Sequence, residues 1–158
     1  MKEYLIDGNN LIGKVPFLQS LQKRNKESAR ERLIFIIERY FHTRNIKVKV
    51  YFDGYANIAI KPDKVTIKYS NSKSADEIMK NDIGTARNPR NLVVVSSDNE
   101  IAGFSRVCAA ESVLSEKFYG MIEKTEVNEM RDEYKRIDEL SNSKNEFVKL
   151  FGVERNEN

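Results

Sequence analysis

The chain has 158 residues, of which 40% are hydrophobic and 32% are charged, and its formal net charge is +3. These values fit one globular domain with a buried core. No apolar run approaches the roughly 18 residues that a membrane helix needs, and no signal-peptide profile precedes the apolar run that starts at Tyr4. The single cysteine, Cys108, excludes an intrachain disulfide and a cysteine-rich zinc site. We therefore expect a cytoplasmic protein.

The charge is distributed unevenly along the chain. Residues 14–49 contain ten Lys/Arg and three Glu, a net charge of +7, whereas residues 125–158 contain six Lys/Arg and nine Asp/Glu, a net charge of −3. A basic segment can bind a phosphate backbone, but it can equally be a solvated helix face, which charge alone slightly favours. If the segment binds RNA, the candidate contacts are Lys14, Lys23, Arg24 and Arg44.

The first third of the chain predicts two strands separated by a helix. Residues 3–7 form a short apolar run typical of a buried strand, and Gly8–Asn10 follow as a turn, with a loop around Pro16. Ser28 can cap a helix to about residue 43, because apolar side chains recur there at helical spacing. Residues 46–52 predict the second strand.

The middle of the chain continues this alternation. Residues 65–69 alternate like a strand near a sheet edge, and residues 75–86 predict a helix that ends before Pro89. Residues 91–96 contain three consecutive valines and no charge, which is typical of a central parallel strand. The remaining elements are a helix over 99–109, a short strand over 112–114 and a helix over 115–123.

The order of these elements predicts a doubly wound α/β sheet with right-handed crossovers. Residues 126–150 are charged, with sparse apolar positions, and predict a separate peripheral amphipathic helix. We expect the tail after Gly152 to be frayed.

Four carboxylates stand where such a sheet places its ligands. Asp7, Asp53 and Asp98 each follow a predicted strand, and Asp76 opens a predicted helix. The carboxyl ends of parallel strands meet at one edge of the sheet, where ligands bind. Acidic groups gathered there repel one another unless a cation neutralises them. Carboxylate oxygens suit Mg²⁺ or Mn²⁺, so the pattern predicts metal-assisted hydrolysis of a phosphodiester.

Each of these acids also has a purely structural interpretation. Asp76 can cap its helix in competition with Ser74, and Asp98 can cap the helix over 99–109. Asp7 and Asp53 can be turn formers before the glycines that follow them. For any one acid the two interpretations are about equal, but four acids converging on one edge by accident is a weaker explanation.

Three further residues are supporting candidates. Asp82 lies six residues after Asp76, so it is not quite on the same helix face. Asn10 can hold the Asp7 carboxylate or a metal-bound water, or it can merely shape the turn. Ser97 can bind a carboxylate or a phosphate oxygen, or act as a cap.

Other chemistries find little support in the sequence. His42 is the only histidine, which excludes a ribonuclease mechanism that needs two. Neither a Walker-type phosphate loop nor a Gly-x-Gly-x-x-Gly motif occurs. A receiver-like domain with Asp53 as the phosphoacceptor ranks low, because it needs an acidic pair after the first strand and Asp7 stands alone there.

Four short motifs occur in a particular order: Asp-Gly-Asn-Asn-Leu-Ile at 7–12, Tyr-Phe-Asp-Gly at 51–54, Ser-Ala-Asp at 74–76 and Val-Ser-Ser-Asp at 95–98. Together they resemble the NYN domain of the PIN-like nuclease superfamily, and most closely the YacP-like bacterial ribonuclease group. The opening motif of that group is similar to Asp-Gly-Tyr-Asn, and here Asn9 stands in place of the tyrosine. The resemblance covers roughly residues 3–123.

The resemblance implies a PIN-like three-layer sandwich with a mostly parallel central sheet. It implies a nuclease domain over residues 1–124 and a charged C-terminal helical extension over 125–158. Asp7, Asp76 and Asp98 map onto the acidic metal centre of the family, and Asp53 onto a strand-end acid that is less certainly a ligand.

The implied activity is that of an Mg²⁺- or Mn²⁺-dependent endoribonuclease. Similar members act in translation-linked decay, including cleavage of mRNA on the ribosome. The alternative is a PIN-like module that binds RNA or the ribosome without cutting. The number of metal ions and the oligomeric state stay open.

Overall fold

The computed structural model describes residues 1–151, and the expectation for the tail after Gly152 lies outside them. Within them a five-stranded sheet has the order β3-β2-β1-β4-β5, and every neighbouring pair is parallel. The strands are β1 (Glu3–Asp7), β2 (Lys47–Phe52), β3 (Val65–Tyr69), β4 (Leu92–Val95) and β5 (Glu111–Val113). The predicted α/β class is confirmed, β3 is an edge strand as expected, and the sheet is entirely rather than mostly parallel.

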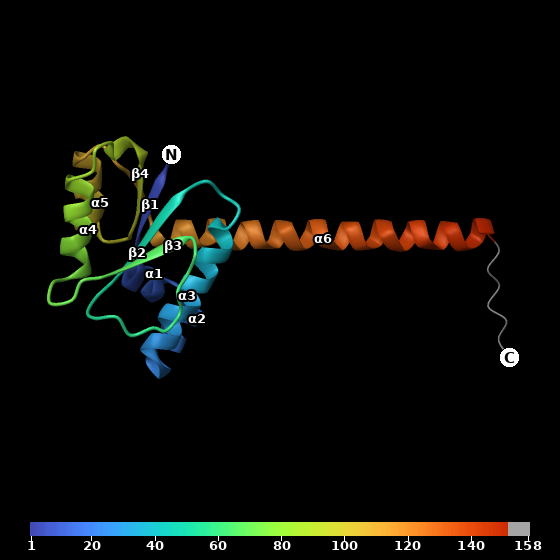
Figure 1. Cartoon of the computed structure of the whole chain (residues 1–158), viewed down its shortest axis with the longest axis horizontal. Helices are drawn as coiled ribbons and strands as arrows, with labels where there is room; N and C mark the ends of the chain where they lie inside the picture. The colour runs from blue at the N-terminus through green and yellow to red at the C-terminus, as the bar shows by residue number, and fades with distance from the viewer. Residues whose placement is uncertain (152–158) are drawn as a thin grey trace. The chain divides into compact units, whose positions relative to one another are not determined.

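Helices cover both faces of this sheet, which gives the three layers. Figure 1 shows α4 and α5 on one side of the sheet and α1, α2 and α3 on the other. The helices are α1 (Gly8–Lys14), α2 (Pro16–Arg24), α3 (Lys26–Phe41), α4 (Ala75–Gly84), α5 (Asn99–Val107) and α6 (Ser115–Phe151), with a 3-10 turn, η1, at Pro89–Asn91.

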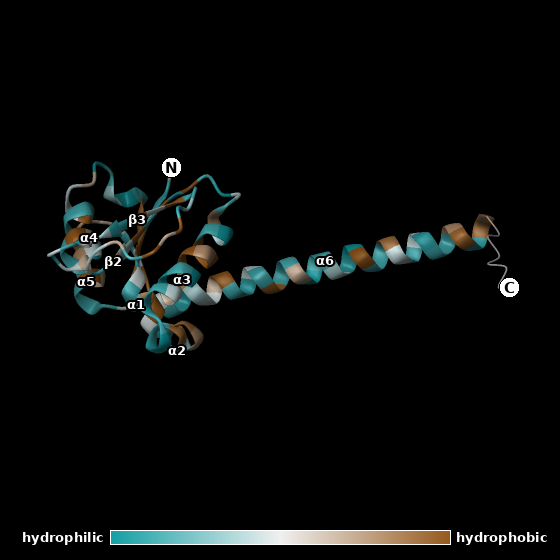
Figure 2. Ribbon diagram, turned by 60° about the horizontal axis from the view of Figure 1, so that its bottom comes forward, coloured by the Kyte–Doolittle hydropathy of each residue, from teal (hydrophilic) through white to brown (hydrophobic). Residues whose placement is uncertain are grey.

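Alternation along the strands divides the core between the two faces. Leu5, Tyr51 and Val94 point to the side of α4 and α5, where they pack with Met79 and Ile101. The ribbon coloured by hydropathy shows apolar residues on the strands and on parts of the covering helices (Figure 2). Burial on both faces explains why β4 is apolar at every position.

An aromatic cluster fills the opposite face. The rings of Phe41 and Phe118 are nearly parallel with centroids 6.1 Å apart, and Tyr4 packs against both. Phe41 and Phe118 are fully buried. Through this cluster the end of α3 and the first turn of α6 pack against β1.

Two short helices stand where the sequence predicted a turn and a loop. Asp7 caps α1 by accepting from the backbone N–H of Asn10, and Pro16 occupies the first turn of α2. Proline is favoured there because the N–H that it lacks would have no intrahelical partner. Gly8 fits α1 closely against β2, since a Cβ atom would lie 2.8 Å from the Tyr51 carbonyl oxygen. The loop and turn predictions were therefore wrong.

Two helix boundaries also differ from the prediction. The cap of α3 is Asn25, whose side chain accepts from the N–H of Ser28, so the helix starts earlier than expected. The separate helices predicted for 115–123 and 126–150 are one continuous helix, α6, over Ser115–Phe151. No proline or glycine after Gly120 interrupts it before Gly152.

The chain divides into two compact units, Met1–Gly120 and the part from Met121 onward. In the second unit the apolar side chains of α6 that follow the buried Ile122 are exposed, for example those of Met130 and Ile137. No helix among residues 1–151 is both long and apolar enough to span a membrane. The division predicted at residue 124 stays a prediction.

The aromatic cluster generates a stability prediction. We expect Phe118→Ala to lower the free energy of unfolding by about 3–5 kcal/mol, because a fully buried ring leaves a cavity when it is removed. Urea denaturation followed by circular dichroism measures this change. Phe35→Ala is the matched control, since Phe35 is 55% exposed and its loss should change stability little. Equal effects of the two substitutions would contradict the assignment.

Candidate functional site

The sheet reverses its direction of growth at β1. The chain adds β2 and β3 on one side of β1 and then returns to add β4 and β5 on the other. In open α/β sheets, ligands bind beyond the carboxyl ends of the strands at this switch point. Asp7 ends β1, and Asp98 lies three residues after the end of β4. The topology thus brings these two acids to the same point.

Asp7 is a buried carboxylate, only 4% exposed. Its Oδ1 accepts from the backbone N–H of Asn10 at 3.2 Å, and its Oδ2 accepts from the hydroxyl of Ser96 at 2.9 Å. Burial raises the pKa of Asp7 to about 6. These two hydrogen bonds oppose the rise, and the negative charges of Asp76 and Asp53 add to it. An ionised Asp7 is therefore costly without a cation.

Asp76 lies in the first turn of α4 but does not cap it. Ser74 is the cap, in a reciprocal capping box with Glu77. Among residues 1–151, Asp76 has neither a side-chain hydrogen bond nor an ion pair. Burial, followed by the charges of Asp98 and Asp53, raises its pKa, while Lys80 opposes the change. Asp76 is thus a partly buried carboxylate without a partner.

Asp98 is both the cap of α5 and a member of the acid group. Its Oδ1 accepts from the N–H groups of Glu100 and Ile101, so Oδ2 stays available to a cation. Its own N–H donates to the Ser96 hydroxyl at 3.1 Å, and the same hydroxyl donates to Asp7. Ser96 therefore sets the spacing between the two acids.

Asp53 organises the backbone around the acids. Its Oδ1 accepts from the N–H of Ala75 at 2.7 Å, and its Oδ2 accepts from the side-chain amide of Asn9. The following residue, Gly54, has φ +81°, a conformation that favours glycine. Both carboxylate oxygens are occupied, so Asp53 ties the start of α4 to α1 and to the end of β2.

A buried arginine on α3 donates a hydrogen bond to the backbone at Asp53. Arg30 on α3 is 2% exposed and donates to the Asp53 carbonyl at 2.8 Å and to the Asn57 side chain at 3.0 Å. Its guanidinium lies 4.7 Å from the centre of the Phe52 ring. Burial lowers the pKa of Arg30, and the nearby charge of Asp53 opposes this shift.

Asn10 connects the ends of β1 and β4 to α6. Its side-chain oxygen accepts from the Ser97 N–H at 2.9 Å and from the Ser115 hydroxyl at 2.7 Å. Asn10 thus holds Asp7 through its backbone, whereas the sequence suggested its side chain. The Ser97 hydroxyl donates to Glu116, which lies 3.7 Å from the Lys14 ammonium group.

Asp82 does not join the acid group. Its carboxylate accepts from the Tyr51 hydroxyl at 2.6 Å and pairs with Lys68 at 2.8 Å. Burial raises the pKa of Asp82, but the hydrogen bonds from Lys68 and Tyr51 outweigh it and leave the pKa lowered. Because Asp82 lies further along α4 than Asp76, it faces the opposite, amino-terminal edge of the sheet, where Glu3 begins β1.

The predicted RNA contacts lie at both edges of the sheet. Lys14 ends α1 near the acids, and Lys23 and Arg24 end α2, just before α3 runs back from the carboxyl edge to the start of β2. Arg44 follows α3 at the amino-terminal edge, where its guanidinium lies 4.2 Å from the Tyr40 ring centre. Three of the four candidates are therefore on the side of the acids.

The acids fit a hard cation by their chemistry. Within residues 1–151, no group of three or more His, Cys, Asp or Glu side chains converges on one point as a metal cluster. None of Asp7, Asp76 and Asp98 forms an ion pair in that part of the chain. Mg²⁺ is typically bound by one or two carboxylates, with water and substrate phosphate as the other ligands. The donor set thus suits a site that substrate completes.

Several residues around the acids were not singled out from the sequence. Ser96 is one of two serines in its motif and gives no signal of its own, Asn9 was noted only in place of a tyrosine, and Arg30 lies in a segment whose basic composition suggests an exposed charge. Lys80 could have been found, because it lies four residues after Asp76 on the same helix face. Glu116 gave no local signal, since only the fold brings it to Ser97.

A three-layer parallel α/β fold with unpaired carboxylates at its switch point is the arrangement expected of a PIN-like nuclease-type domain. The model of the YacP-like NYN domain matches residues 4–151, and the chain belongs to this family. Membership supports a nuclease-type function related to RNA.

Two solved structures are similar to the chain, both of Rae1 (YacP) from Bacillus subtilis. A single-residue mutant has 25% identity and a TM-score of 0.72, with 92% of this chain and 89% of that chain covered. The protein without that mutation has 24% identity and a TM-score of 0.72, with 96% and 93% covered. No curated protein matches the chain.

The burial of Asp7 generates a pH-dependent stability prediction. The folded protein holds the Asp7 proton up to a pH of about 6, above the ordinary pKa of 3.8, so ionisation at higher pH destabilises the fold. We expect Asp7→Asn to raise the metal-free free energy of unfolding by about 1–3 kcal/mol at pH 8. The gain should shrink as the pH falls through 6 toward 4.

Urea denaturation in EDTA at several pH values measures this difference. Asp132→Asn is the control, because Asp132 lies on the exposed surface of α6 and should show no such trend. A lower free energy of unfolding in Asp7→Asn at pH 8 would show that the buried charge does not destabilise the fold.

Proposed function

We propose that this protein is a divalent-metal-dependent endoribonuclease that hydrolyses RNA phosphodiester bonds. The observation that carries the proposal is the group of carboxylates without cationic partners at the switch point, with raised pKa values at Asp7 and Asp76. Such a group attracts Mg²⁺ or Mn²⁺, because a bound cation removes the repulsion among the acids.

In this proposal Asp7, Asp76 and Asp98 hold the metal. A divalent ion held by these three carboxylates would supply a water of lowered pKa and would stabilise negative charge on the leaving oxygen. Ser96 keeps Asp7 and Asp98 in register, and Asp53 positions the start of α4 that carries Asp76. The role of Asp7 requires its ionised form, so metal affinity should fall below a pH of about 6.

Basic side chains near the acids suit the RNA backbone. Lys14, Lys23 and Arg24 lie on the side of the acids, and their charges would lower the cost of bringing phosphates to a negative site. We further propose that the substrate is mRNA on the ribosome, cleaved in translation-linked decay in the cytoplasm. This part of the proposal follows from the family resemblance alone.

Substitution of the acids tests the catalytic proposal. We expect Asp76→Asn and Asp98→Asn each to lower the rate of RNA cleavage in Mn²⁺ at least about 100-fold, because each removes a charged ligand. Asparagine still caps a helix, so Asp98→Asn should keep α5 intact. Asp63→Asn, an exposed acid outside this group, is the control and should cleave like the wild type.

The alternative is a module that binds RNA or the ribosome without cutting it. The observation that favours it is that no group of three metal-ligating side chains converges among the described residues. A thermal shift separates the two functions. If Mn²⁺ stabilises the wild type but not Asp7→Asn, the acids bind metal. If purified protein neither gains stability in Mn²⁺ nor cleaves free or ribosome-bound RNA, the protein is a binding module and not a nuclease.

The basic side chains generate a separate binding prediction. We expect the double variant Lys23→Gln, Arg24→Gln to bind RNA more weakly and to reduce the slope of log affinity against log salt by about 1–2, because up to two phosphate contacts are lost. Fluorescence anisotropy with labelled RNA in EDTA measures both. The matched control is Lys135→Gln, Arg136→Gln, which neutralises another adjacent Lys-Arg pair on an exposed helix. Equal effects in the two variants would exclude a specific role for α2.

A further inference from the structure

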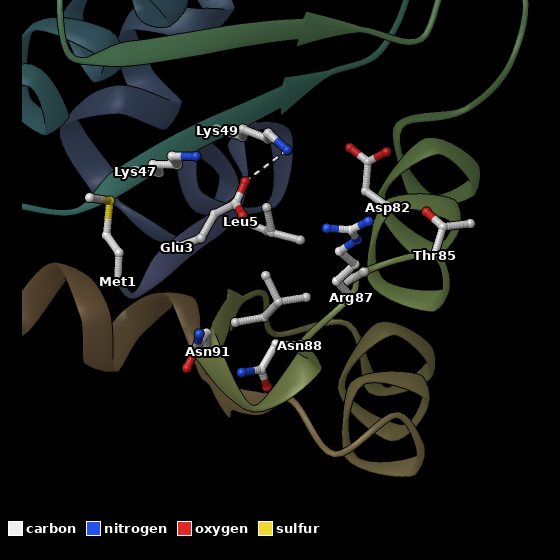
Figure 3. A pocket seen from close by; sticks show the side chains of 12 residues that line it. Met1, Glu3, Leu5, Lys47, Lys49, Asp82, Thr85, Arg87, Asn88 and Asn91 are labelled. Carbon is white, nitrogen blue, oxygen red and sulfur yellow. Dashed lines mark ion pairs between the residues drawn. The ribbon is translucent and has the colours of Figure 1, made fainter.

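A second candidate site lies at the opposite edge of the sheet from the acids. A cavity of about 440 Å³ opens where β1, β2 and β4 begin, and it is closed by the end of α4 and by η1. Figure 3 shows Lys47 and Lys49 of β2 on one side of this cavity. Asn91, which ends η1, and Asn88, which precedes η1, lie on the other side. A cavity of roughly 300–1,000 Å³ suits a small ligand.

The two carboxylates of this cavity are already neutralised. Glu3 pairs with Lys49 at 2.7 Å, and Asp82 pairs with Lys68 at 2.8 Å while accepting from Tyr51. These pairs leave the cavity without an unpaired negative charge. An anionic ligand would therefore meet no uncompensated repulsion from its walls.

Two cations of the cavity have no partner. Lys47 and Arg87 form neither an ion pair nor a side-chain hydrogen bond within residues 1–151. Both line the cavity, and both are exposed enough to be reached from solvent. Figure 3 shows the Arg87 guanidinium directed into the cavity near Leu5 and Asp82. A guanidinium and an ammonium group facing one space are the usual means of binding a phosphate.

The rest of the lining suits a nucleobase. Met1, which is 65% exposed, and the half-buried Ala86 give the lining its accessible apolar surface, and Asn88 and Asn91 place amide side chains at its border. An apolar surface can contact the flat face of a base, and an amide offers both a donor and an acceptor to its edge. An inorganic anion would use only the cations, whereas a nucleotide uses all three kinds of group.

We propose that this cavity binds a nucleotide, with Arg87 and Lys47 on the phosphate and with the base against the apolar lining and beside the two asparagines. The site is separate from the acids, because β1 puts roughly 13 Å of strand between Glu3 and Asp7. The proposal does not depend on cleavage or on metal binding, so it can fail while the proposed nuclease activity holds, and the reverse.

Binding in solution tests the proposal. Isotope-labelled full-length protein, tagged only at the C-terminus because Met1 lines the cavity, is titrated in EDTA with UMP and with AMP. We expect amide resonance shifts at Lys47, Arg87 and Asn91 at millimolar nucleotide. Arg87→Gln should weaken the affinity at least about tenfold, because a charge-assisted hydrogen bond to phosphate is lost. Lys47→Gln should weaken it as well.

Arg90→Gln is the matched control, since Arg90 is an exposed arginine of η1 that does not line the cavity. Its affinity should equal that of the wild type. Shifts confined to the residues around Asp7 and Asp98, or equal affinity in Arg87→Gln and Arg90→Gln, would overturn the proposal. Inorganic phosphate binding as tightly as UMP would also overturn it, because the base would then contribute nothing.

Two sources of a nucleotide are distinguished in the same way. A short oligonucleotide with a 5′-phosphate is compared with the same strand lacking that phosphate and with the mononucleotide. Tighter binding of the phosphorylated strand assigns the cavity to the end of an RNA chain, and tighter binding of the mononucleotide assigns it to a free nucleotide.

Discussion

The ionised carboxylate of Asp7 is the constraint on which the candidate site depends. It lies buried at the end of the central strand, where the Asn10 N–H and the Ser96 hydroxyl hold one oxygen each. These bonds fix the start of α1 and the end of β4 relative to β1. They do not remove the cost of the buried charge, because the pKa still rises to about 6. The arrangement is therefore well ordered but electrostatically incomplete, which is the condition that a cation relieves.

Asp53 and Arg30 show how nearby charges serve the same site without belonging to it. Both oxygens of Asp53 are used in fixing α1 and α4, so its charge acts on Asp7 and Asp76 from a distance. Arg30 donates to the backbone of Asp53 and stacks on Phe52, so the buried cation supports the loop after β2. Asp53 thus repels the charges of Asp7 and Asp76 and fixes the backbone around them. The other acids would be the metal ligands.

The sequence predicted the strands and long helices, whose residue patterns are periodic. It did not predict short helices or contacts between residues that are distant in the sequence. Apolar runs located β1 and β4, where burial on both faces demands them, and alternation located the edge strand β3. The helices after Asp7 and Pro16 were missed, because seven to nine residues hold too few apolar positions to show a helical period. The partners of Asp82 could not be predicted, because Lys68 and Tyr51 lie on two strands that only the fold brings to α4. Likewise, only packing buries Arg30 within a segment whose composition is basic.

Charge is separated across the sheet in a way that keeps both edges available. At the amino-terminal edge, Lys49 and Lys68 neutralise the acids, and Lys47 and Arg87 are left over. At the carboxyl edge, three acids are left over, and Lys80 pairs with Glu100 instead of with Asp76. A further lysine placed among Asp7, Asp76 and Asp98 would form ion pairs and remove the attraction for a metal ion. A free acid beside Arg87 would do the same for a phosphate. The charges that are left without a partner at each edge therefore determine which ligand that edge can attract.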